Sequence, residues 1–149
     1  MKVKDLFEDY SGSFHTIEQD QTVGQALKLM SAYNISALVV MTDEVTKGIF
    51  TERDLVRCHI LFPGQDIIEI LVKDVMTTKL IAVDPDDTIE DAMGMMIKAK
   101  IRHLPVTSDG QITGMLCLEN LVKKHVSVLT NEIVYLKNYI SDLQDAAHD

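Results

Sequence analysis

The stretch TVGQALKLMSAYNISALVVMTDEVTKGIFTERDL at residues 22–55 recurs, 66 positions later and without a gap, as TIEDAMGMMIKAKIRHLPVTSDGQITGMLCLENL at residues 88–121. Identical residues occupy corresponding places in both copies, including Thr22 and Thr88, Gly48 and Gly114, and Leu55 and Leu121. Self-similarity at a fixed offset indicates that a chain is built from copies of one structural unit. The 149 residues are therefore predicted to form two half-domains, although the length by itself suggests one domain.

Each copy predicts the same order of elements, β-α-β-β-α. Apolar residues recur at helical spacing at positions 23–30 and 89–96, directly after Thr22 and Thr88 as N-caps. Apolar runs before and after each helix predict strands, including a first strand over 80–83 in the second copy. A unit of this size has a marginal core, so the two copies should pack together with pseudo-twofold symmetry. The predicted class is α+β, with paired clefts between the repeats.

The repeat divides the chain into four parts. Residues 1–58 are predicted to form the first repeat, 59–71 a linker that packs against the pair, and 72–123 the second repeat. A leader recurs as well, since Val3-Lys4-Asp5 matches Val72-Lys73-Asp74 at an offset of 69. Residues 124–149 lie beyond the repeat and show a different period.

Composition excludes several classes of partner. The chain carries 14 Lys and Arg against 23 Asp and Glu, a net charge of −9, whereas nucleic acids and anionic membranes attract basic proteins. No segment approaches the roughly 18 apolar residues of a membrane-spanning helix, and the start of the chain shows no targeting signal. The two cysteines are too few for a zinc cluster or a disulfide scaffold. These features predict a cytoplasmic protein with reduced thiols and no metal site.

The motifs together resemble the tandem cystathionine-β-synthase (CBS) domain pair, or Bateman module. The resemblance covers roughly residues 1–123 and rests on the duplicated unit, on the segments 74–77 and 101–106, and on residues 48–55. It implies a non-catalytic regulatory sensor that binds an adenosine-containing ligand, such as AMP, ADP, ATP or S-adenosylmethionine, in the clefts between the repeats. It also implies a homodimer.

The family's ribose and phosphate signature stands here as Gly48-Ile49-Phe50-Thr51-Glu52-Arg53-Asp54. A carboxylate such as Asp54 can accept hydrogen bonds from both ribose hydroxyls, and Thr51 at a helix start can bind a phosphate oxygen. Arg102, in a short basic stretch with Lys98, Lys100 and His103, is the expected phosphate cation. Carried over by position, the resemblance implies a first cleft formed by Ser36, Ile49, Thr51, Asp54, Thr77, Leu80, Ile81, Ile101 and Arg102.

The second copy departs from this signature, because Cys117 and Asn120 replace the hydroxyl and the carboxylate. A thiol is a weak donor, and an amide cannot accept two hydroxyl protons as a carboxylate does. The second cleft is therefore expected to be weaker, differently selective or empty. The residues implied for it are Phe14, His15, Ile35, His103, Cys117 and Asn120, and Arg102 is an alternative to His103.

Structural explanations exist for several of these residues. Thr51 and Asp54 can simply cap a helix, and a cation such as Arg102 is favoured near the C-terminal end of a helix. His103 lacks partners at metal-ligand spacing, which indicates a structural role. Cys117 with His103 as its base suggests an enzyme, but a thiol at the end of an apolar strand is usually inert. A dimeric interaction scaffold with filled clefts is the main alternative to nucleotide binding.

The tail carries an apolar seam spaced alternately by three and four residues: Val126, Leu129, Ile133, Leu136, Ile140 and Leu143. β-Branched residues occupy the a positions and Leu the d positions, which favours a parallel two-stranded coiled coil. Glu132 and Lys137 fall at g and the following e, where they can pair across a dimer. An amphipathic helix folded back on the module is the alternative.

Overall fold

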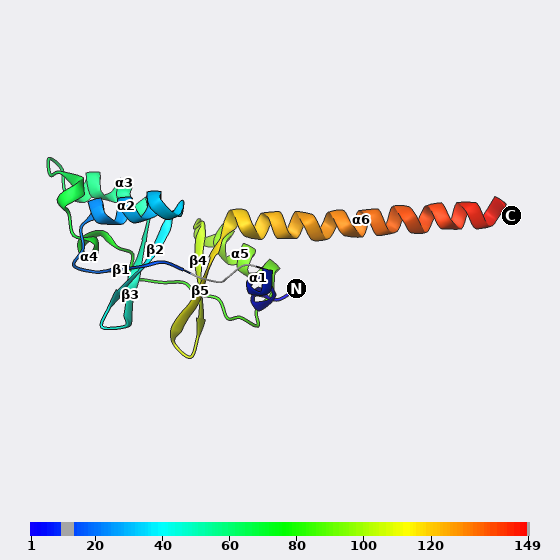
Figure 1. Cartoon of the computed structure of the whole chain (residues 1–149), viewed down its shortest axis with the longest axis horizontal. Coiled ribbons are helices and arrows are strands. Elements are labelled where there is room, and N and C mark those ends of the chain that lie inside the picture. Colours follow the sequence, from blue (N-terminus) through cyan, green and yellow to red (C-terminus); the bar gives the residue numbers. More distant parts are fainter. Residues whose placement is uncertain (10–13, 149) are drawn as a thin grey trace.

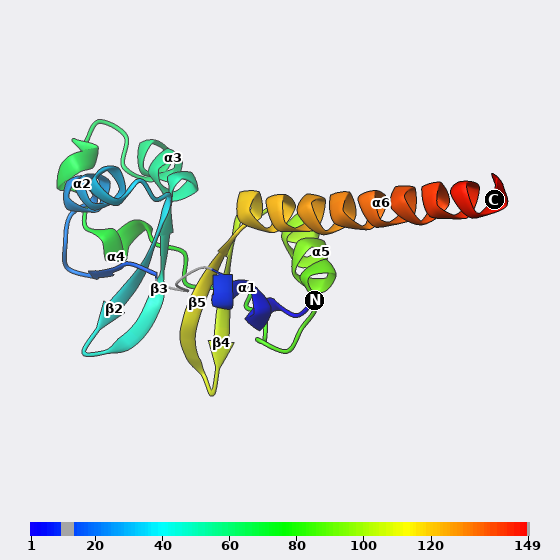
Figure 2. The same cartoon turned by 45° about the vertical axis from the view of Figure 1, so that its right-hand side comes forward.

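The computed structural model describes residues 1–9 and 14–148, with two α+β units followed by one long helix (Figure 1). The first unit contains β1 (Thr16–Glu18), α2 (Val23–Tyr33), β2 (Ala37–Thr42), β3 (Val45–Thr51) and α3 (Glu52–Leu61). Strand β2 lies between β1, to which it is parallel, and β3, to which it is antiparallel. Helices α2 and α3 cover one side of this sheet (Figures 1 and 2).

The second unit repeats the plan with α5 (Ile89–Ala99), β4 (His103–Ser108) and β5 (Gln111–Cys117). The predicted N-caps form at both helix starts, each as a capping box, with Thr22 paired to Gln25 and Thr88 to Asp91. Both hairpins carry a register shift at the corresponding place, after Val40 in β2 and after Val106 in β4. The predicted duplication and α+β class are thus confirmed down to the irregularities of the strands.

The predicted strand over 80–83 is wrong, because only Val83 pairs, in a single parallel bridge to Val106. In the first unit the Val39 amide donates to the His15 carbonyl at 2.9 Å, which extends the β1–β2 ladder. The residue 66 positions after Val39 is Pro105, which has no N–H. The second ladder therefore loses that bond and ends at Val83.

The two leaders are exchanged between the units. Helix α1 (Val3–Asp9) places Val3 and Leu6 in the core of the second unit, beside Val83 and Ile89. Helix α4 (Val72–Val75) instead completes the core of the first unit, and the Val72 amide donates to Gln21 O at 2.8 Å. Each repeat, taken as a stretch of sequence, therefore needs the leader of the other to close its core.

The linker follows the first unit closely. A single 3₁₀ turn, η1 (Ile67–Glu69), lies against α2, where a Cβ on Gly24 would come within 2.9 Å of the Ile68 carbonyl oxygen. Phe62 and Ile67 are partly buried against the first core. The linker thus packs against the first unit, whereas the sequence predicted packing against the pair.

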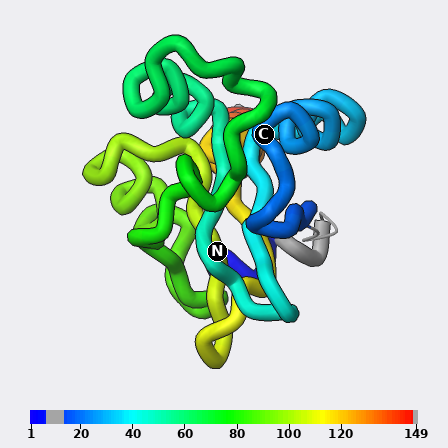
Figure 3. Tube along the Cα trace, turned by 90° about the vertical axis from the view of Figure 1, so that its left-hand side faces the viewer, coloured from blue at the N-terminus to red at the C-terminus, as the bar shows by residue number. Residues whose placement is uncertain are grey.

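Helix α6 (Leu118–His148) is continuous from the second unit into the tail, so the boundary predicted at 123/124 falls inside one helix. It projects away from both units (Figures 1 and 2), and Figure 3, which looks along the long axis, shows it receding behind them. The six seam residues are 44–55% exposed. The alternative of a helix folded back on the module is therefore not the arrangement in this structure. Residue 149 lies outside the described residues.

Candidate functional site

A first cavity of about 440 Å³ lies where the two repeats meet. Its walls come from the end of β3, the first turns of α3, the segment after α4 and the α5–β4 junction, so both repeats contribute. The lining residues are Ile49, Thr51, Glu52, Arg53, Val56, Thr77, Ile101, Arg102 and His103. The volume falls within the range of small-molecule sites.

A short backbone bridge holds the walls of this cavity together. The amides and carbonyls of Ile49 and Thr77 exchange two hydrogen bonds, at 3.0 and 2.9 Å. The neighbouring position must be glycine, since a Cβ on Gly48 would lie 2.4 Å from the Thr77 carbonyl oxygen. The glycine of the quoted signature therefore allows one repeat to approach the other.

Asp54 lies behind the cavity wall and is fully buried. Its Oδ2 accepts from the Thr51 amide at 2.9 Å, and its Oδ1 accepts from Thr77 Oγ1 at 2.8 Å and from Arg57 Nη1 at 3.2 Å. The carboxylate thus caps α3 and ties the first repeat to the segment after α4. It is not among the lining residues, and its role as a ribose ligand stays a prediction.

Two arginines give the first cavity its positive charge. The Arg53 guanidinium donates to the carbonyl oxygen of Lys100, and Arg102 Nη2 forms an ion pair with Glu119 Oε1 in the first turn of α6. Lys100 ends α5 in the left-handed region, at φ 56°. Ile49, Val56 and Ile101 add apolar surface to the lining and Glu52 adds a carboxylate, so apolar and charged side chains share the cavity.

His103 stands between the first cavity and a second one and lines both. Its Nε2 is 2.7 Å from Ser36 Oγ. Burial, and next the charge of Arg102, lower the pKa of His103, so the ring is neutral near pH 7. This histidine is a structural divider between the two cavities.

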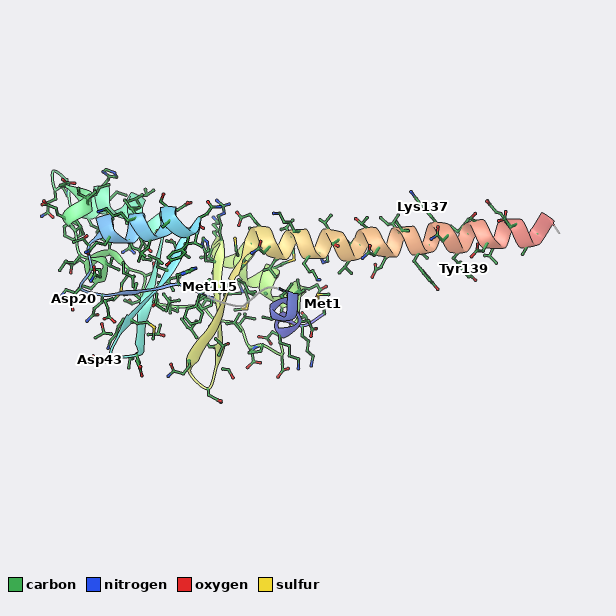
Figure 4. All side chains as sticks on the ribbon, viewed as in Figure 1. Met1, Asp20, Asp43, Met115, Lys137 and Tyr139 are labelled. Atoms are coloured by element: carbon green, nitrogen blue, oxygen red, sulfur yellow. The ribbon has the colours of Figure 1, made fainter. Side chains whose placement is uncertain are left out.

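The second cavity has a volume of about 300 Å³. All six residues named for the second cleft line it, namely Phe14, His15, Ile35, His103, Cys117 and Asn120. Asn34, Ser36, Ala37 and Met115 complete the wall, and Met115 is labelled at the junction of the two units in Figure 4. In contrast to Asp54, its counterpart Asn120 is exposed and faces the cavity.

The first cleft is distributed differently from the sequence expectation. Ile49, Thr51, Thr77, Ile101 and Arg102 meet at the cavity, as expected. Ser36 lines the second cavity instead, while Leu80 and Ile81 line neither. Sequence reasoning missed Glu52, Arg53, Val56 and His103 at the first cavity, and Asn34, Ser36, Ala37 and Met115 at the second. Met115 could have been found, because it is the repeat counterpart of Ile49.

Neither cysteine forms a reactive pair. Burial, and next the Asp54 charge, raise the pKa of Cys58, which makes its thiol inert. Cys117 lies opposite His103 in the β4–β5 register, but its Sγ donates to Glu119 Oε2 while His103 bonds Ser36.

In the described part of the chain, no three His, Cys, Asp or Glu residues are grouped as metal ligands. No described helix is long and apolar enough to cross a membrane.

Comparison with known proteins agrees with this architecture. The family model of the CBS domain matches residues 3–60 and 72–127. The mitochondrial protein CBSX3 of Arabidopsis thaliana is 36% identical over 134 residues, which is 87% of this chain and 65% of that protein. The chain thus spans slightly less than two thirds of this relative.

Two solved structures show the same fold. The CBS domain protein NE2398 is 37% identical, with a TM-score of 0.79 over 85% of this chain and 98% of that one. CBSX2, solved in complex with AMP, is 24% identical, with a TM-score of 0.66 over 85% of this chain and 97% of that one. At that identity CBSX2 supports the fold alone.

Proposed function

Because this chain belongs to the CBS domain family, we propose that its CBS pair acts as a regulatory module that binds an adenosine-containing ligand in the first cleft. The observation that carries the proposal is the cavity of about 440 Å³ formed by both repeats, whose lining includes the apolar Ile49 and Ile101 and the cationic Arg53 and Arg102. Apolar side chains suit a purine ring, and guanidinium groups suit phosphate. CBSX2, which shares the fold, was itself solved with AMP, a ligand of the class proposed here.

Calorimetric titration of ligand-free protein with AMP, ADP, ATP and S-adenosylmethionine tests the proposal. We expect heat with at least one of them, weakened by Arg102→Ala. Lys98→Ala is the matched control, because Lys98 belongs to the same basic stretch but does not line either cavity. The absence of heat with all four ligands would overturn the proposal.

The module is proposed to work without catalysis. The Cys117 thiol and the His103 ring, the candidate nucleophile and base, are each bonded to a different partner. A general base must reach the proton that it removes. Turnover of an adenosine ligand that disappears in Cys117→Ser would contradict this part of the proposal.

The alternative is an interaction scaffold in which no nucleotide is bound. The second cavity, with its thiol and amide in place of hydroxyl and carboxylate, is the feature that favours it. The two functions are distinguished by heating purified protein and measuring the ultraviolet absorbance of the supernatant. A released nucleotide absorbs near 260 nm, and the chain has no Trp. A regulated partner protein and a cytoplasmic location remain part of the proposal.

We also propose that α6 joins two copies as a parallel coiled coil. Its seam is exposed over three heptads, and Lys137 and Tyr139 extend into the space around the helix (Figure 4). A hollow of about 520 Å³ beside the seam is lined by α6 alone, from Val128 to Leu136. One helix cannot enclose a ligand, so this hollow fits the packing surface of a second helix better than a small-molecule site.

Sedimentation or light scattering of the full chain tests this dimer. Leu136→Asp, at a d position, should yield monomers, whereas Asn138→Asp, at an f position, should not. In a Cys117→Ser background, Leu143→Cys should oxidise to a dimer, because equal positions at the end of the seam meet in a parallel, in-register coil and lie far apart in an antiparallel one. A dimer that survives Leu136→Asp would overturn the proposed interface.

A further inference from the structure

We propose that Glu119 sets how strongly the first cleft binds the phosphate groups of its ligand, because it holds the Arg102 guanidinium that a phosphate would otherwise bind. The inference rests on the adenosine-ligand function proposed above and concerns the specificity of the same site. Arg102 lines the first cavity and is paired with Glu119 Oε1. A phosphate group reaching Arg102 must therefore displace an anion that belongs to the protein.

The pair is placed where such an exchange is possible. Side chains of Arg102 and Glu119 are 64% and 45% exposed, so the ion pair is screened by water and weak. A phosphate carries more charge than a carboxylate and accepts bidentate hydrogen bonds from arginine. Exchange of the carboxylate for a phosphate thus favours the ligand, although the ion pair between Arg102 and Glu119 must be broken. Adenosine has no phosphate and binds without breaking this pair.

Arg53, the other arginine of the cavity, provides an internal contrast. Its guanidinium donates to the neutral carbonyl oxygen of Lys100. A phosphate binding there separates no ion pair. The specificity effect is therefore assigned to Glu119 through Arg102 and not to both arginines alike.

Once displaced, the Glu119 carboxylate stays near the bound phosphates, because it is held in the first turn of α6. The Leu118 amide donates to the Arg102 carbonyl at 2.9 Å, which fixes the start of α6 to the cavity wall. A retained negative charge repels a triphosphate more than a monophosphate. Glu119 thus biases the cleft toward ligands with few phosphate groups.

Titration of the wild type and of Glu119→Gln with adenosine, AMP and ATP tests this role. We expect Glu119→Gln to bind AMP about three- to fivefold more tightly, the upper part of the range of an exposed ion pair, and to gain a larger factor for ATP. Adenosine should bind within about twofold of the wild type. Glu44→Gln is the control, because this substitution removes the same charge from an exposed position in the β2–β3 turn, outside both cavities.

The double variant Arg102→Ala, Glu119→Gln completes the test. Without Arg102, the Glu119→Gln substitution should give AMP little or no gain, which a general change in net charge would not explain. Equal changes for all three ligands, or none, would overturn the role of Glu119 while adenosine binding stands. If none of the three ligands binds the wild type or either variant, the proposed function itself fails.

Discussion

Replacing Asp54 should destabilise the fold far more than replacing its repeat counterpart, Asn120. The buried Asp54 carboxylate accepts three hydrogen bonds, from the Thr51 amide, the Thr77 hydroxyl and the Arg57 guanidinium. Asp54→Ala leaves the partly buried Thr51 amide without its acceptor and removes the link between the two repeats. The half-exposed Arg57 can turn to water, so its bond contributes least.

The expected loss is about 2–4 kcal/mol of unfolding free energy, from the hydrogen bonds of the partly buried Thr51 amide and Thr77 hydroxyl to a charged acceptor and from the lost helix cap. For a chain of this size, that corresponds to a fall in Tm of roughly 4–16 °C. Asn120→Ala removes an exposed amide and should change the unfolding free energy by less than about 0.5 kcal/mol.

Thermal and urea unfolding followed by circular dichroism measure both variants under one condition. Asp54→Asn separates charge from shape: it keeps the volume but presents an NH₂ group to a donor, so it should fall between the wild type and Asp54→Ala. If Asp54→Ala melts within about 2 °C of the wild type, the structural role argued for this carboxylate is refuted. A loss of ligand binding in Asp54→Ala would then point directly to a contact between this carboxylate and the ribose.

Three further outcomes follow from single positions. Gly48→Ala should lower stability by about 1–3 kcal/mol through contact with the Thr77 carbonyl, whereas Gly94→Ala, with open space around the added Cβ, should raise it in thermal melts. Glu44→Gly should stabilise the β2–β3 turn by about 1 kcal/mol in urea titrations, because Glu44 lies at φ 63°. Because the pKa of His103 is lowered on folding, the native state binds that proton more weakly than the unfolded chain. Unfolding free energy should therefore fall as pH drops below about 6.5, and His103→Gln should reduce that fall in urea titrations at different pH values.

The repeat predicted the duplicated α+β fold, because the order of the elements follows from the order of the residues. In the structure, the counterparts Cys117 and Asn120 line the second cavity with Phe14 and His15, and their role in binding stays a prediction. Side-chain direction is different, since it depends on contacts between distant segments. The Ser36 hydroxyl bonds His103 and faces the second cavity, and the chain order alone does not give that direction.

The exchange of leaders also lies beyond sequence reasoning. Residues 3–5 and 72–74 are the same three residues, so either copy could pack on either half by pattern alone. The path of the linker determines which leader packs on which core. Helix α4 comes directly after the linker, which lies along α2, and closes the first core. The N-terminal leader is then left to the second core, where Val3 and Leu6 are buried.

The asymmetry of the clefts follows from how each repeat ends. Helix α3 has ten residues and begins beside the cavity, so it depends on the Asp54 cap to hold its first turn. Helix α6 has 31 residues and is anchored through the Leu118 amide and the Glu119 side chain. Position 120 is thereby released from capping and its side chain reaches the second cavity. The first cleft thus has a buried carboxylate behind its wall, whereas the second has an exposed amide in its lining.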